Sequence, residues 1–143
     1  MRFWDASALL PLIVSESGSE LVAPWLKEDP EVVVWGLTRV EIASAIERRA
    51  RAGQLSSSER SALLLRAERV VNDAHEVLDL SAVRVRATAL LARHALRAAD
   101  AAQLGAALLV ADPDPSSLTM VVLDRRLADA AAREGLRVLG WPD

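Results

Sequence analysis

Short apolar runs rich in β-branched residues alternate with longer helical stretches along the whole chain. The clearest run is EVVVW at residues 31–35, and it is followed by TRVEIASAIERRARAG, a helical stretch that ends at Gly53, a favourable residue after a helix. Such alternation favours a parallel sheet with helices on both faces. We therefore expect a three-layer α/β/α fold around a central, mainly parallel sheet of four to five strands. The other candidate strands are MRFWD, EVLDL, LTMVVLD and LRVLG.

Three local signals place helix starts and loops. Ser56, with Glu59 three residues later, predicts a capping box at the start of a long helix. In GSELVAPWLKED, Pro24 is expected near the start of a helix, where proline is tolerated. The two Asp-Pro steps in DPDPSS predict a loop. No repeat or linker divides the chain, and we expect a single domain over residues 1–143.

The amino-acid composition limits the kinds of catalytic and metal site that the chain can form. The chain has 143 residues and is 52% hydrophobic, enough for a full core, which excludes disorder as its main state. Cysteine is absent, which excludes disulfides, thiolate zinc sites and cysteine nucleophiles. His75 and His94 are the only two histidines, too few for a His-rich metal site. Any metal would be held mainly by oxygen ligands, which favours Mg²⁺ or Mn²⁺ over zinc.

Charge and the first residues bear on location and partners. MRFWDASALL is neither a signal peptide nor a membrane span, so we expect a cytoplasmic protein without membrane contact. The net charge of −3 argues against binding nucleic acid by bulk electrostatics. The basic residues are nevertheless sixteen arginines and one lysine, Lys27. Arginine is the better bidentate phosphate ligand, although a GC-rich genome would give the same bias.

Four acids fall where expected strands end or where the following helices begin. Asp5 and Asp124 each directly follow a strand, whereas Glu41 and Asp100 lie in the first turns of helices. Ligands of open parallel sheets bind beyond the carboxyl ends of the strands. Clustered carboxylates raise one another's pKa, and a divalent cation offsets that repulsion. The pattern therefore predicts a divalent-metal site.

Each of these acids also has a purely structural interpretation. Acids are favoured in first helical turns by the helix dipole. Thr38 with Glu41 fits a capping box, and Asp100 with Gln103 nearly does. Asp124 fits a simple N-cap. The residues alone leave both interpretations open.

Four segments resemble the PIN-domain ribonucleases, and within them the VapC-type toxins of bacterial toxin–antitoxin pairs. The resemblance implies a PIN-like α/β/α fold and Mg²⁺- or Mn²⁺-dependent hydrolysis of RNA phosphodiester bonds, which leaves a 5′ phosphate. It implies that the catalytic and metal-binding residues are Asp5, Glu41, Asp100 and Asp124. The matching segments, in the family's order, are FWDASALLPL, TRVEIASAI, LRAADAAQLGAAL and VVLDRRLADAA.

The resemblance also suggests supporting residues. Ser7 and Thr38 match positions where the family often has a hydroxyl, although helix capping would explain both. Arg97, three residues before Asp100, is expected either to reach a phosphate or to pair with an acid. Many members carry a further acid or polar residue shortly after the last aspartate. Here two arginines follow it, so the number of metal ions stays open.

The resemblance implies a neutralising antitoxin and a homodimer, beside the RNA substrate. The alternative within the family is a non-catalytic PIN-like domain that binds RNA or a protein. Two other classes fit poorly. A phosphotransferase with an aspartate nucleophile needs an acid where Ser7 stands, and a receiver domain needs a lysine after a late strand, whereas Lys27 lies early in the chain.

Overall fold

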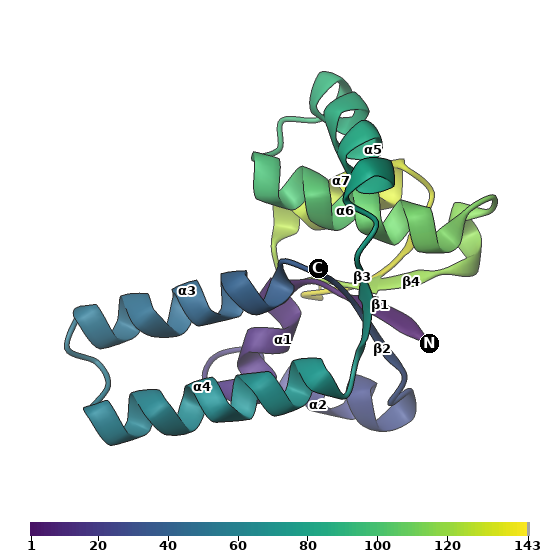
Figure 1. Ribbon diagram of the computed structural model, residues 1–143. Helices are drawn as coiled ribbons and strands as arrows, with labels where there is room; N and C mark the ends of the chain where they lie inside the picture. Colours follow the sequence, from purple (N-terminus) through teal and green to yellow (C-terminus); the bar gives the residue numbers. More distant parts are fainter. Residues whose placement is uncertain (143) are drawn as a thin grey trace.

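A five-stranded sheet, in which all neighbouring strands are parallel, runs through the computed structural model, which describes residues 1–142 (Figure 1). Its spatial order is β3-β2-β1-β4-β5, so the chain builds outward from β1 on one side and then on the other. The strand order therefore reverses between β1 and β4. The strands are β1 (Arg2–Trp4), β2 (Val32–Trp35), β3 (His75–Val77), β4 (Thr119–Val121) and β5 (Arg137–Leu139).

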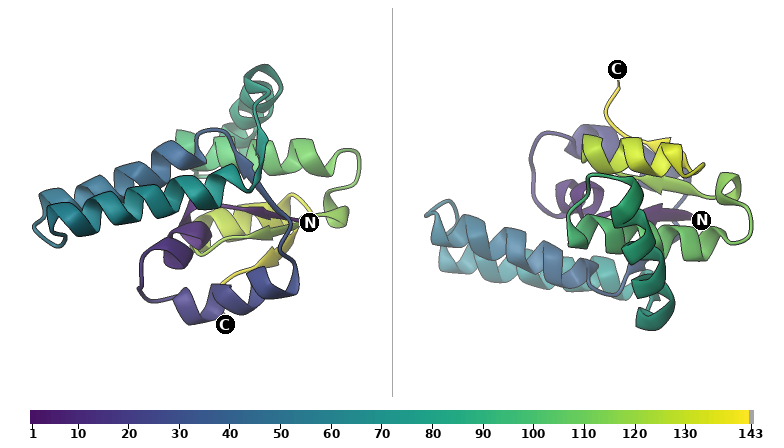
Figure 2. Two further views of the ribbon diagram at one scale, coloured as in Figure 1. Left: turned by 60° about the horizontal axis from the view of Figure 1, so that its bottom comes forward. Right: turned by 90° about the horizontal axis from the view of Figure 1, so that it is seen from above.

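Helices cover both faces of this sheet, which confirms the expected three layers (Figures 1 and 2). Four helices pack on one face: α1 (Ala6–Ile13), α2 (Ser19–Glu28), α3 (Thr38–Arg51) and α4 (Ser57–Asn72). Three pack on the other: α5 (Leu80–Arg93), α6 (Ala98–Ala111) and α7 (Arg125–Arg133). In both figures α3 and α4 lie side by side and project beyond the sheet as a helical pair.

Each central strand supplies both cores, because successive side chains of a strand point to opposite faces. In β1, Phe3 packs under α5–α7 and Trp4 packs under α1–α4, and both are fully buried. Met120 and Val121 divide in the same way in β4. A strand buried on both faces reads as a continuous apolar run, which explains EVVVW.

The helices and loops lie close to where the sequence signals predict them, except that Pro24 has a different position in its helix. The Ser56–Glu59 capping box is formed at the start of α4, and DPDPSS contains only a short 3-10 turn, Pro115–Ser117. Pro24, however, is the sixth residue of α2 rather than near its start, so that prediction was wrong. Pro24 lies on the solvent-exposed side of α2. Because proline has no N–H, one helix carbonyl lacks its usual donor, and water can donate to it there.

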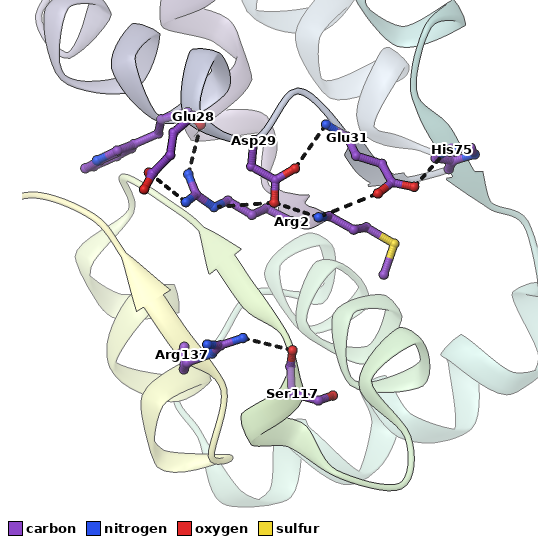
Figure 3. A network of polar contacts seen from close by, with 9 residues as sticks. Arg2, Glu28, Asp29, Glu31, His75, Ser117 and Arg137 are labelled. Carbon is purple, nitrogen blue, oxygen red and sulfur yellow. Dashed lines mark hydrogen bonds and ion pairs between the residues drawn. The ribbon is translucent and has the colours of Figure 1, made fainter.

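The amino-terminal edge of the sheet carries a network of paired charges (Figure 3). The Met1 amino group lies 2.6 Å from Asp29 Oδ2, and Arg2 Nη2 lies 2.7 Å from Glu28 Oε2. Arg137 Nη2 donates to the Ser117 carbonyl at 3.0 Å. The charges at this edge thus have partners within the chain. No helix of residues 1–142 has both the length and the apolar character needed to cross a membrane.

Candidate metal centre

Asp5 lies at the carboxyl end of β1, beside the point where the strand order reverses. Its N–H donates to the Val121 carbonyl at 3.0 Å, which continues the pairing of β1 with β4. Its carboxylate caps α1 by accepting from the Ser7 N–H at 2.9 Å. Only 4% of Asp5 is exposed. The reversal point of an open parallel sheet is where ligands bind, so Asp5 lies where the sequence predicted.

Ser7 forms hydrogen bonds on the other side of this reversal point, where β4 ends. Its Oγ accepts hydrogen bonds from the N–H groups of Leu123, at 2.9 Å, and Asp124, at 3.2 Å. Asp5 is the cap of α1, so the capping interpretation of Ser7 was wrong. The hydroxyl instead joins α1 to the chain between β4 and α7. Asp124 does cap α7, as one interpretation predicted, with Oδ1 accepting from the Leu127 N–H at 2.8 Å.

Glu41 occupies the first turn of α3, but the predicted capping box with Thr38 is not formed. The N-cap is Leu37, and Thr38 is already helical. The Thr38 hydroxyl is fully buried and accepts from Gln103 Nε2 at 3.1 Å. The same nitrogen donates to Glu41 Oε1 at 2.9 Å. A tertiary contact with α6 therefore occupies the groups that would have formed a local cap.

Asp100 is the third residue of α6 and is partly buried. The N-cap of this helix is Arg97, which makes no side-chain capping bond. The near-capping box of Asp100 with Gln103 is not formed, because the Gln103 side chain reaches α3 instead. Asp100 lines a cleft together with Glu41 and Asp124. An acid within this mostly apolar helix thus shares a cleft with two of the other acids, whereas Asp5 is not among the residues that line it.

This cleft has a volume of about 790 Å³, and its lining includes four exposed arginines, Arg48, Arg97, Arg125 and Arg126, which we call the arginine rim. Arg48 was not singled out from the sequence, although it lies two helical turns after Glu41 on the same face of α3. None of the ion pairs among residues 1–142 involves Arg97, so the predicted pairing with an acid is not found. The lining residues are Val40, Glu41, Ser44, Arg48, Arg97, Ala99, Asp100, Asp124, Arg125 and Arg126.

Comparison with known proteins now identifies the family. The family model described as PIN domain matches residues 2–133, a range that contains all four acids. The chain belongs to the PIN domain family. Ribonuclease VapC45 from Mycobacterium tuberculosis is 36% identical over 140 residues, which cover 95% of this chain and 92% of that protein. The resemblance predicted from the four sequence segments is confirmed.

Solved structures agree with this PIN fold. FitAcB from Neisseria gonorrhoeae is 17% identical, covers 97% of this chain and 96% of its own, and superposes with a TM-score of 0.68. A toxin–antitoxin complex from Klebsiella pneumoniae is also 17% identical, with coverage of 90% and 91% and a TM-score of 0.64. At these identities the similarity concerns the fold alone.

The four acids of this PIN domain interact electrostatically. Burial raises the pKa of Asp5 to about 6, and the Asp100 charge adds to the rise, although hydrogen bonds from Ser7 oppose it. Burial also raises the pKa of Glu41 to about 7, with further contributions from Asp5 and Asp100. The pKa of Asp100 is raised by burial and then by Asp124. Asp5, Asp100 and Asp124 therefore each raise the pKa of another acid of the set, and the pKa of Glu41 is raised by two of them.

The donor set fits a hard divalent cation. All four side chains offer carboxylate oxygens, and each positive charge placed among them would lower the pKa values that burial and repulsion raise. Within residues 1–142, no three acidic or histidine side chains converge closely enough to hold an ion together in this geometry. Mg²⁺ is usually bound through one or two carboxylates and keeps several waters, so a full protein cage is not required.

Proposed function

We propose that this PIN domain is a divalent-metal-dependent endoribonuclease and the toxin of a VapBC-type toxin–antitoxin pair. The main support is one cleft that is lined by the partly buried Glu41 and Asp100, by Asp124 and by four arginines. Acids of this kind bind metal, and arginines bind phosphate. The similarity to a protein named Ribonuclease VapC45 supports RNA as the substrate.

The roles proposed for the acids rest on the PIN-family resemblance, since no three acidic side chains of residues 1–142 converge on one point. Asp5, Asp100 and Asp124 would hold the ion, and Glu41 would be either a further ligand or the group that orients the attacking water. PIN ribonucleases generally use a divalent metal, and we propose Mg²⁺ or Mn²⁺ here. When bound, such an ion supplies Lewis-acid stabilisation of phosphoryl charge and lowers the pKa of water.

Side chains of the cleft supply the remaining chemistry. Glu41, whose pKa burial raises in the metal-free cleft, is the candidate to accept a proton from the attacking water. Arg97 and Arg126 lie close enough to Asp100 to lower its pKa, so a phosphate bound over Asp100 would be within their electrostatic reach. The guanidinium groups would orient the phosphodiester and offset its charge.

We also propose an antitoxin partner, a homodimer and a cytoplasmic location. The toxin–antitoxin complex from Klebsiella pneumoniae has the same fold, which supports the antitoxin. Apolar surface adjoins the acids, since Val40 lines the cleft and is 57% exposed. An antitoxin segment that packed on Val40 would cover the cleft and exclude RNA.

A second candidate is a PIN-like domain that binds RNA or a protein without cutting. It is favoured by the lack of three converging acids among residues 1–142. Cleavage of an RNA panel that includes tRNA, by antitoxin-free protein with Mg²⁺, Mn²⁺ or EDTA, separates the two candidates.

Substitution at the acids gives this experiment its controls. We expect metal-dependent cleavage that EDTA abolishes, and that Asp5→Asn and Asp100→Asn each lower by about 100-fold or more, since a lost ligand forfeits several kcal/mol of charge stabilisation. Asp129→Asn is the matched control, because Asp129 lies on α7 outside the cleft. Failure of the folded wild type to cut any RNA would favour the binding domain.

A further inference from the structure

Gln103 is a fully buried polar residue in the middle of the otherwise apolar part of α6. Burying an amide is unfavourable unless it forms hydrogen bonds. Gln103 directs its Nε2 group across to α3, where it donates to Thr38 Oγ1 at 3.1 Å and to Glu41 Oε1 at 2.9 Å. These partners are 65 and 62 residues away in sequence. The amide thus serves a contact between helices rather than its own helix.

The orientation of the Gln103 amide is set by its hydrogen bond to Glu41. Within residues 1–142, Gln103 Oε1 is buried and has no hydrogen-bond partner. Turning the amide over would let Oε1 accept from the Thr38 hydroxyl, but would place that oxygen against the Glu41 carboxylate. The observed orientation therefore leaves its own acceptor unpaired in order to donate to a carboxylate. Hydrogen bonds to ionised groups are about twice as strong as neutral ones.

The contact joins the first turn of α3 to the second turn of α6, and both helices carry candidate ligands. Thr38 and Glu41 lie one turn apart on α3, and Asp100 and Gln103 lie one turn apart on α6. Thr38 is itself fully buried and accepts from the same nitrogen as Glu41, so it anchors the amide beside Glu41. A side chain locked in this way holds its partner in a defined geometry.

We propose that Gln103 is a positioning residue: it holds the Glu41 carboxylate in the cleft, so that Glu41 faces the same ion as Asp100. This inference rests on the proposed metal-dependent function. It assigns Gln103 no contact with RNA or with the reacting phosphate. Its effect on the reaction passes through Glu41.

The test replaces Gln103 by Met, which keeps the length of the side chain and removes both donors. We expect Mn²⁺ affinity, measured by titration calorimetry without RNA, to fall by about 10-fold, as for other residues that orient metal ligands. In cleavage assays kcat should fall while KM for RNA stays within about twofold, because the arginine rim is intact. Leu104→Val, a fully buried neighbour on α6 that packs in the core under α5–α7, is the control for lost packing.

A double-mutant cycle with Glu41→Gln distinguishes positioning from a general structural role. If Gln103 acts through Glu41, Gln103→Met should change Mn²⁺ affinity little in the Glu41→Gln background. Unchanged affinity in the single variant, an additive loss in the double variant, or an equal loss in Leu104→Val would overturn the proposal. Should Gln103→Met not fold, Thr38→Val removes the amide's anchor, and unchanged Mn²⁺ affinity there would overturn it. Failure of wild type to bind Mn²⁺ would instead overturn the proposed function itself.

Discussion

Asp5 is a buried residue whose surroundings oppose its charge. Burial raises its pKa to about 6, so the folded protein keeps this proton over a pH range in which the unfolded chain, with a pKa of 3.8, has lost it. Metal-free protein should therefore lose stability as pH rises from about 4 to 6, by about 3 kcal/mol from this group. Glu41, with a pKa of about 7, extends the same loss to higher pH.

Asp5→Asn should remove most of this loss while keeping the helix cap, because an asparagine oxygen can still accept from the Ser7 N–H. We expect the variant to be more stable than wild type in EDTA at pH 8, and to gain little at pH 4.5, where the wild-type carboxyl is protonated. Urea unfolding at both pH values measures this difference. Mn²⁺ should stabilise wild type at pH 8 and Asp5→Asn much less. Parallel pH profiles for the two proteins would contradict this account.

Among the elements, the junction between β4 and α7 depends on one hydroxyl from α1. Ser7→Ala leaves the N–H groups of Leu123 and Asp124 without their acceptor. We expect a loss of about 1–3 kcal/mol in the free energy of unfolding, and weaker Mn²⁺ binding because Asp124 is no longer held. Ser7→Thr keeps the hydroxyl and should retain both properties better. Equal behaviour of the two variants would show that the hydroxyl does not hold the junction.

The same elements show what the sequence could predict. Local signals sufficed where structure is local: the β-branched run of β2, the Ser56–Glu59 capping box and the acids that follow strands all lie as expected. Thr38 and Gln103 were misinterpreted as parts of caps because their true partnership crosses 65 residues. Capping motifs report only the nearest turn, so a buried contact between α3 and α6 leaves no local pattern. The polar Gln103 within an apolar helix was the one available hint.

At the scale of the whole molecule, charged side chains are arranged differently at the amino-terminal and carboxyl edges of the sheet. The net charge of −3 argued against binding nucleic acid by bulk electrostatics. At the amino-terminal edge, however, charges are paired, as between Arg2 and Glu28. At the carboxyl edge the cleft combines acids with an arginine rim. Net charge could not predict this separation, because it depends on the sheet gathering residues from both halves of the chain.

This separation predicts a localised salt dependence of RNA binding. Each phosphate contact to single-stranded nucleic acid contributes about −0.7 to the slope of log K against log salt concentration. Replacing both Arg97 and Arg126 by Ala should therefore make the slope shallower by about 1.4. Arg137→Ala, at the opposite edge beside Ser117, should leave it unchanged. The slopes are measured by fluorescence anisotropy with a labelled single-stranded RNA. EDTA is present to stop cleavage, and the KCl concentration is varied about fourfold, from roughly 50 to 200 mM. If the double variant at Arg97 and Arg126 gave the wild-type slope, RNA would not bind at the arginine rim of this cleft.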